Sequence, residues 1–136
     1  MNDYLTEPVH FARSRHQHRF EVQEIWNDRI VILSVRDAVD MLSAPELTEA
    51  ICDALDKAPA GLIIDLTDVN FLASVGMSVL MAAQEAADAL SLRFGIVAHG
   101  AATSRPITLL GIDAILTLYP TLDDGLRDLR RPPALA

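Results

Sequence analysis

The central segment of this chain reads Asp65-Leu66-Thr67-Asp68-Val69-Asn70-Phe71-Leu72-Ala73-Ser74-Val75-Gly76-Met77. Residues 61–66, which lead into this segment, are apolar on both faces, which is typical of a central strand covered on two sides. Residues 75–90 carry apolar side chains at helical spacing and contain no proline, so we expect a helix there. In this interpretation a short loop joins the two elements, and Ser74 stands at the N-cap of the helix.

Ser74 has two interpretations from its position alone. The simpler one is a helix cap, since serine is among the residues preferred there. The other is a regulatory phosphorylation site, because a phosphoryl group at a helix start meets free backbone N–H groups and the positive end of the helix dipole. Spacing does not choose between them.

The rest of the chain alternates strands and helices. Apolar runs at 20–25 and 29–35, separated by the turn 26–28, predict a hairpin. Ser43-Ala44-Pro45-Glu46 predicts a capping box and a helix that ends near Lys57. Further elements follow from the same signals: a strand at 92–98, a helix at 104–110, a strand at 115–118 and a helix from Thr121 that stops before Pro132. The predicted fold class is α/β, a mixed sheet of about five strands opened by an N-terminal hairpin, with about four helices packed on it.

The composition favours one domain and no membrane span. The chain has 136 residues, 51% of them hydrophobic, but no apolar run approaches the ~18 residues that cross a bilayer. The first eight residues lack the basic and apolar regions of a secretion signal. The single cysteine, Cys52, is expected to be a small buried residue of the helix over 45–57. These features favour a cytoplasmic protein.

The two ends are expected to lie outside the domain. Residues 1–18 show no period, so we interpret them as a flexible arm before a domain at 19–131 and a tail at 132–136. His16 and His18 have a spacing that suits a metal on a strand, but no carboxylate or cysteine accompanies them, so no metal site is expected.

Acidic residues are concentrated in one part of the chain. The net charge is −8, and residues 37–74 contribute eight acids against the single cation Lys57. Such a block disfavours nucleic acid and anionic membranes and suits a partner with a basic surface. Most of these acids are expected on the solvated face of a helix, whereas Asp40 and Asp68 are expected on loops.

Four segments resemble a STAS domain of the anti-sigma factor antagonist type, a likeness that extends over about residues 20–129. Residues 37–47 resemble a loop and helix start of that family, with Asp40 at its characteristic aspartate and Asp37 where glycine is usual. Residues 64–71 resemble the strand and loop before the phosphorylated serine, and residues 109–113 the segment before the last strand. In the fourth segment, residues 73–77, Ser74 and Gly76 fit the family, but Ala73 and Val75 replace an aspartate and a hydroxyl residue.

The resemblance implies a bacterial transcription regulator that works by partner switching. Unmodified Ser74 would dock on an anti-sigma factor of the serine kinase type and so release a sigma factor, and phosphorylation of Ser74 would end the docking. ATP would belong to the kinase, so we expect no cofactor, no catalysis and no small-molecule substrate here. The candidate partner-binding residues are Asp40, Asp68, Ser74, Gly76, Met77, Ser78, Met81 and Glu85.

Helical spacing assigns two faces to the helix after Ser74. A docking face is expected at Ser74, Met77, Ser78, Met81, Glu85 and Asp88, and a sheet-facing side at Val75, Val79, Ala83, Ala86, Ala87 and Leu90. Met77 and Met81 also suit the edge of the core, where methionine fills irregular gaps, and both interpretations stay open.

Two other functions compete with this one. Because Ala73 and Val75 depart from the family pattern, the chain is alternatively a constitutive STAS scaffold of a stress-signalling or lipid-transport complex, with Ser74 unphosphorylated. A serine hydrolase would need Ser74, His99 and Asp40 as a triad, but Leu72 stands where a nucleophile elbow has glycine. We therefore do not expect an enzyme. No phosphate loop of the Walker type and no cysteine or histidine metal cluster is present in the sequence.

Overall fold

A computed structural model describes residues 19–132. The expected flexible arm, with His16 and His18, and most of the expected tail lie outside this range. Among residues 19–132, no helix combines the length and the apolar content needed to pass through a bilayer.

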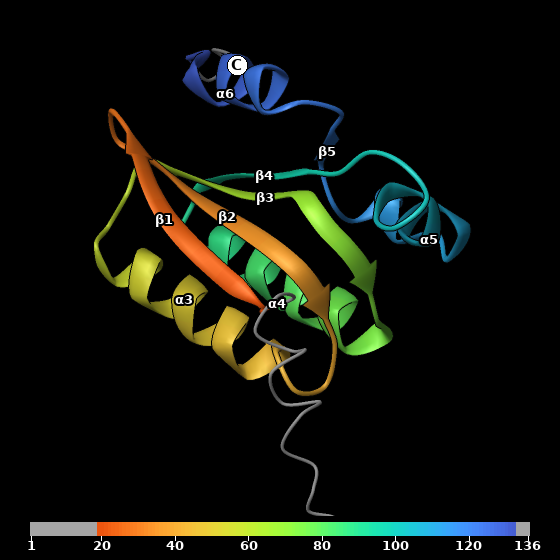
Figure 1. The fold of residues 1–136 in the computed structure, drawn as a ribbon. Helices are drawn as coiled ribbons and strands as arrows, with labels where there is room; N and C mark the ends of the chain where they lie inside the picture. The colour runs from red at the N-terminus through yellow and green to blue at the C-terminus, as the bar shows by residue number, and fades with distance from the viewer. Residues whose placement is uncertain (1–18, 133–136) are drawn as a thin grey trace, which may run out of the picture.

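The domain is built on one mixed sheet (Figure 1). Its five strands lie in the order β1-β2-β3-β4-β5, with β1 antiparallel to β2 and every other pair parallel. Their bounds are β1 (Glu21–Asn27), β2 (Ile30–Val39), β3 (Gly61–Leu72), β4 (Arg93–Val97) and β5 (Leu118–Tyr119). The expected opening hairpin and mixed sheet are confirmed. The last strand begins at Leu118, three residues later than the sequence predicted.

Helices cover both faces of the sheet. Helices α3 (Ala44–Asp56) and α4 (Ser74–Ala89) lie side by side on one face, and α6 (Leu122–Arg130) lies on the other (Figure 1). The short α5 (Ser104–Leu109) and the 3₁₀ turn η2 (Ile112–Ala114) connect β4 to β5. The α/β class and the expected four helices are therefore confirmed.

The strand interiors explain why residues 61–66 are apolar on both faces. Successive side chains of a strand point to opposite faces of the sheet. Leu62 and Ile64 belong to the larger core under α3 and α4, whereas Ile63 packs in a smaller cluster with Leu126 and Leu129 of α6. A strand between two helical layers needs apolar residues at every position.

The expected loop after residue 66 is wrong, because β3 continues to Leu72 and pairs with β2 along this length. The ladder is irregular, with register shifts between Ser34 and Arg36 and between Asp37 and Ala38. Asp37 has a φ of +80°, a left-handed conformation that favours glycine. The usual glycine of the family at this position thus has a backbone reason, and in this chain Asn70 Nδ2 donates to Asp37 Oδ1 at 3.2 Å.

The start of α3 departs from the expected capping box. Ser43 does stand at the N-cap, but its side chain makes no cap hydrogen bond. Its Oγ donates to the Ala38 carbonyl at 2.7 Å and accepts from the Asp40 amide at 2.9 Å. Cys52 is exposed, not buried as expected, because α3 turns Leu47 and Ala54 toward the sheet instead.

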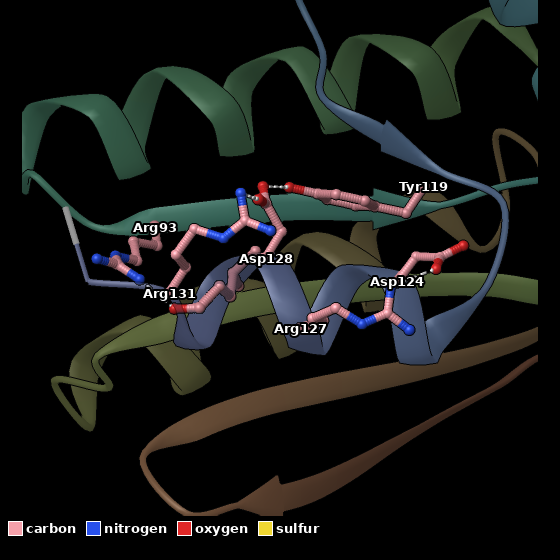
Figure 2. Close-up of polar contacts among 7 residues, drawn as sticks. Arg93, Tyr119, Asp124, Arg127, Asp128 and Arg131 are labelled. Atoms are coloured by element: carbon pink, nitrogen blue, oxygen red, sulfur yellow. Dashed lines mark hydrogen bonds and ion pairs between the residues drawn. The ribbon is translucent and has the colours of Figure 1, made fainter. Parts of the chain in front are cut away.

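The C-terminal helix is attached to β4 and β5 by polar contacts (Figure 2). Thr121 Oγ1 caps α6 by accepting from the Asp124 amide at 3.1 Å. The Tyr119 hydroxyl donates to Asp128, and Arg93 donates to the Leu129 carbonyl. Burial, followed by the hydrogen bond to the Asp128 carboxylate, raises the pKa of Tyr119 to about 12.

Candidate docking site around Ser74

Ser74 is the first residue of α4 and not its N-cap. The N-cap is Ala73, with φ −81° and ψ 167°, and its amide donates to the Val39 carbonyl at 2.9 Å. Because β3 runs to Leu72, only Ala73 is left to connect strand and helix. The Ser74 side chain is exposed, as a site of modification or docking requires.

The backbone around Ser74 offers hydrogen-bond donors. The amides of Gly76 and Met77 donate to the Ala73 carbonyl at 2.9 and 3.1 Å. Over residues 19–132, the preceding amides of Ser74 and Val75 have no backbone partner, which is normal in the first turn of a helix. An anionic group on the Ser74 hydroxyl would lie next to these donors.

Exposed apolar side chains lie at the same end of the sheet. Leu42 is 91% exposed and Met41 is 77% exposed, and both line one groove together with Val75. Phe71, 55% exposed, stands near the end of β3. Large apolar side chains with this much exposed surface at one end of the sheet indicate an interaction site. We call Met41, Leu42, Phe71 and Ser74 the docking patch.

Asp40 orders the loop that carries Met41 and Leu42. It is half-buried after the end of β2, and its Oδ1 accepts from the amides of Leu42 and Ser43 at 3.0 and 3.1 Å. These bonds form a turn that holds Met41 and Leu42 outward. The characteristic aspartate of the family thus has a structural role in this chain, and Asp40 is on a loop as expected.

The other acidic candidates lie elsewhere. Asp68 is exposed but belongs to β3, opposite Arg36 in the ladder, so its expected loop position is wrong. Glu85 is exposed, eleven residues beyond Ser74, which at 1.5 Å per residue is roughly 16 Å along the helix. The structure therefore places Glu85 well away from the docking patch.

The expected faces of α4 are partly wrong. Met77 is only 4% exposed and belongs to the core, Met81 is half-buried against it, and Leu90 is 60% exposed. Val75 and Val79 line a groove with α3, and Val79 also packs against the core. The helix is rotated because Gly76, Leu80 and Ala83 face inward. Ser78 is exposed as expected, and its hydroxyl donates to the Ser74 carbonyl at 3.3 Å.

Sequence reasoning missed Met41, Leu42 and Phe71. None of them breaks a periodic pattern, because Met41 and Leu42 lie between two elements and Phe71 is next to the buried Leu72. The available signal was an apolar pair directly after Asp40, in a loop where polar residues are usual.

The alternative hydrolase finds no support in the geometry. His99 is exposed after β4, and neither Ser74 nor Asp40 makes a hydrogen bond with it. In the part of the chain that is described, no group of three or more histidine, cysteine or acidic side chains is arranged to hold a metal ion.

Comparison with known proteins identifies relatives of this chain. The family model for the STAS domain matches residues 21–125. The anti-sigma-F factor antagonist RsfB of Mycobacterium tuberculosis is 41% identical over 101 residues, which cover 74% of this chain and 82% of RsfB. A crystal structure of an anti-sigma factor antagonist from Mycobacterium paratuberculosis is 40% identical, with a TM-score of 0.76, and the match covers 84% of this chain and 97% of that one.

A more distant structure shares the fold alone. The Bacillus cell fate determinant SpoIIAA in its phosphorylated form has 13% identity and a TM-score of 0.62, over 82% of this chain and 100% of SpoIIAA. The match to the family model and the identity to RsfB together establish that this chain belongs to the STAS domain family, among the anti-sigma factor antagonists.

Proposed function

We propose that this chain binds an anti-sigma factor through the docking patch and thereby releases a sigma factor. The relative RsfB is named as an antagonist of an anti-sigma-F factor. We assign the same role to this chain, toward an anti-sigma factor that is itself a serine kinase. The carrying observation is the exposed Ser74 in the first turn of α4, whose neighbour Val75 lines a groove together with Leu42, which is 91% exposed. The role requires no catalysis by this chain and places it in the cytoplasm.

The patch suits a partner surface with an apolar pocket and basic surroundings. Met41, Leu42 and Phe71 supply apolar area, and burying one such side chain contributes about 1.5–3 kcal/mol. Glu46, in the first turn of α3, is exposed and lines the same groove as Met41 and Leu42. Acidic groups at the rim of an interface speed association with a basic partner.

Phosphorylation of Ser74 would switch this binding off without refolding. A phosphoryl group adds roughly −1.5 to −2 charge at pH 7. The free amides of the first turn accommodate it in the isolated chain. Burying the same charge against a partner shaped for a hydroxyl has a desolvation penalty, and about 3 kcal/mol weakens binding more than a hundredfold.

The test is the dissociation constant of three variants with the purified anti-sigma factor of the source organism. Ser74→Ala should bind like the unmodified chain, and Ser74→Glu should bind about a hundredfold more weakly. Thr108→Glu adds the same charge at an exposed position of α5, and it should bind normally. Equal affinities of Ser74→Ala and Ser74→Glu would contradict the switch.

Intact-mass measurement after incubation with the partner and ATP tests the modification separately. One phosphoryl group on the natural chain and none on Ser74→Ala is the expected result. Ala73 and Val75 depart from the family pattern next to the serine. If the chain binds its partner and never gains mass, it is a constitutive scaffold.

A further inference from the structure

An apolar groove runs between α3 and α4 on the side away from the sheet. Its floor and walls include Leu55 from α3 and Val75, Val79, Ala82 and Ala86 from α4. The hollow that contains Met41 and Leu42 shares Thr48, Val75 and Val79 with it, so the groove continues to the docking patch.

An acidic stripe borders this groove. Glu46, Glu49, Asp53 and Asp56 follow one another at spacings of three and four residues, which places them on one face of α3. All four are exposed, and none takes part in an ion pair within residues 19–132. Like charges at this spacing destabilise a helix, so the stripe favours a cationic neighbour.

The chain enters the domain beside this stripe. Glu24 of β1 forms an ion pair of 2.7 Å with Lys57, which places the later part of β1 at the end of α3. Phe20 lies four residues earlier and packs against the same core. β1 runs along the flank of α3 opposite to α4 (Figure 1). A segment that leads from Arg19 to the groove can therefore cross the outer face of α3, where the stripe lies.

The segment before β1 has the matching chemistry. Residues 8–19 contain three arginines, three histidines and no acid, and they include Val9 and Phe11. From Arg19 to Phe11, an extended chain reaches up to about 26 Å. That length exceeds the ~10–12 Å diameter of a helix with its side chains.

We propose that residues 8–19 bind across α3, with Arg13 and Arg15 on the acidic stripe and Val9 and Phe11 in the groove. The binding is intramolecular, so even a weak contact is favoured by an effective concentration of the order of millimolar. It occurs in the isolated protein and does not depend on the function of Ser74. Because the groove continues to the docking patch, the bound segment lies beside any partner at Ser74.

Cys52 provides a direct readout, since it is the only cysteine of the chain, is exposed on α3 and lines the groove. The experiment measures how fast a neutral aromatic disulfide reacts with Cys52 in the full chain without any partner. We expect Cys52 to react about tenfold faster in Arg13→Glu/Arg15→Glu than in the natural chain. An effective concentration of the segment that is ten times its dissociation constant from the groove leaves the groove open about a tenth of the time. Phe11→Ser should also react faster.

Two further variants control for charge. Arg105→Glu/Arg127→Glu makes the same change of charge on α5 and α6 and should leave the rate of the natural chain unchanged. Glu49→Arg/Asp53→Arg, added to Arg13→Glu/Arg15→Glu, should restore the slow rate by reversing both sides of the contact. Equal rates for the natural chain and Arg13→Glu/Arg15→Glu would overturn the proposal. Protection that grows with protein concentration would also overturn it, because a second copy would then cover the groove.

Discussion

Gly76 lies so close to Val39 that a Cβ on residue 76 would stand 2.7 Å from Val39 Cγ1. The same added atom would meet Leu72 Cδ1 at 2.7 Å. Val39 also accepts the Ala73 amide through its carbonyl at 2.9 Å. The last residue of β2 therefore fixes both the connection before α4 and the depth of its first turn, and with them the position of Ser74.

Gly76→Ala should destabilise the protein, because the methyl group overlaps two buried side chains. Overpacking of this kind costs about 1–3 kcal/mol, which denaturant unfolding measures. Ser78→Ala is the matched control on the exposed side of the same helix and should stay within about 0.5 kcal/mol of the natural chain. Similar losses for both variants would show that the close contact relaxes freely.

Ala73→Asp should stabilise the protein, because residue 73 is the N-cap of α4 and has no side-chain acceptor. A cap of this type contributes about 0.5–2 kcal/mol, seen as a higher melting temperature. Ala73→Asn supplies a cap oxygen without charge and should have a similar effect. If both variants leave the melting temperature unchanged, the N-cap is not at residue 73.

Leu42→Ser should weaken binding to the anti-sigma factor without loss of stability, because the side chain is 91% exposed in the isolated protein. Losing the burial of one leucine costs about 1.5–3 kcal/mol of affinity. Leu109→Ser, at a residue 74% exposed on α5, is the control and should bind normally. Calorimetric titration compares them, and equal affinity would remove Leu42 from the interface.

Stability should fall as the pH rises from about 10 to about 12, the ordinary and native pKa values of Tyr119. The native state favours the neutral phenol, and this stabilises the folded protein. The stabilisation is fully present below the unfolded-state pKa of about 10 and is lost as the pH rises through the native-state pKa of about 12. Tyr119→Phe should fall less steeply over that range. In Tyr4→Phe, where Tyr119 is the only tyrosine, tyrosinate absorbance should appear near pH 12 in the folded protein. Appearance near pH 10 would contradict the raised pKa.

Hydrophobic period and helix signals were sufficient for the order of elements. Residues 61–66 were predicted as a strand and form one, because a strand covered on both faces is apolar at nearly every position, here all but Asp65. The extension of β3 to Leu72 was not predictable, because Thr67, Asp68 and Asn70 are polar and their pairing depends on the irregular ladder near Asp37.

The rotation of α4 also lay outside what spacing reveals. Spacing assigns the faces by the larger side chains, yet Gly76, which has no side chain, lies so close to Val39 and Leu72 that an added Cβ would overlap both. That contact turns Met77 into the core and leaves Leu90 exposed. For Ser74, the sequence predicted a helix start within one residue, while the exposed Leu42 had no periodic signal.

The pairing of β2 and β3 up to Val39 and Leu72 has a kinetic consequence for recognition. The backbone beneath the patch is already ordered, so a partner meets a preformed surface and association requires little loss of conformational entropy. Differences in affinity between modified and unmodified chains should then appear mainly as different residence times of the complex.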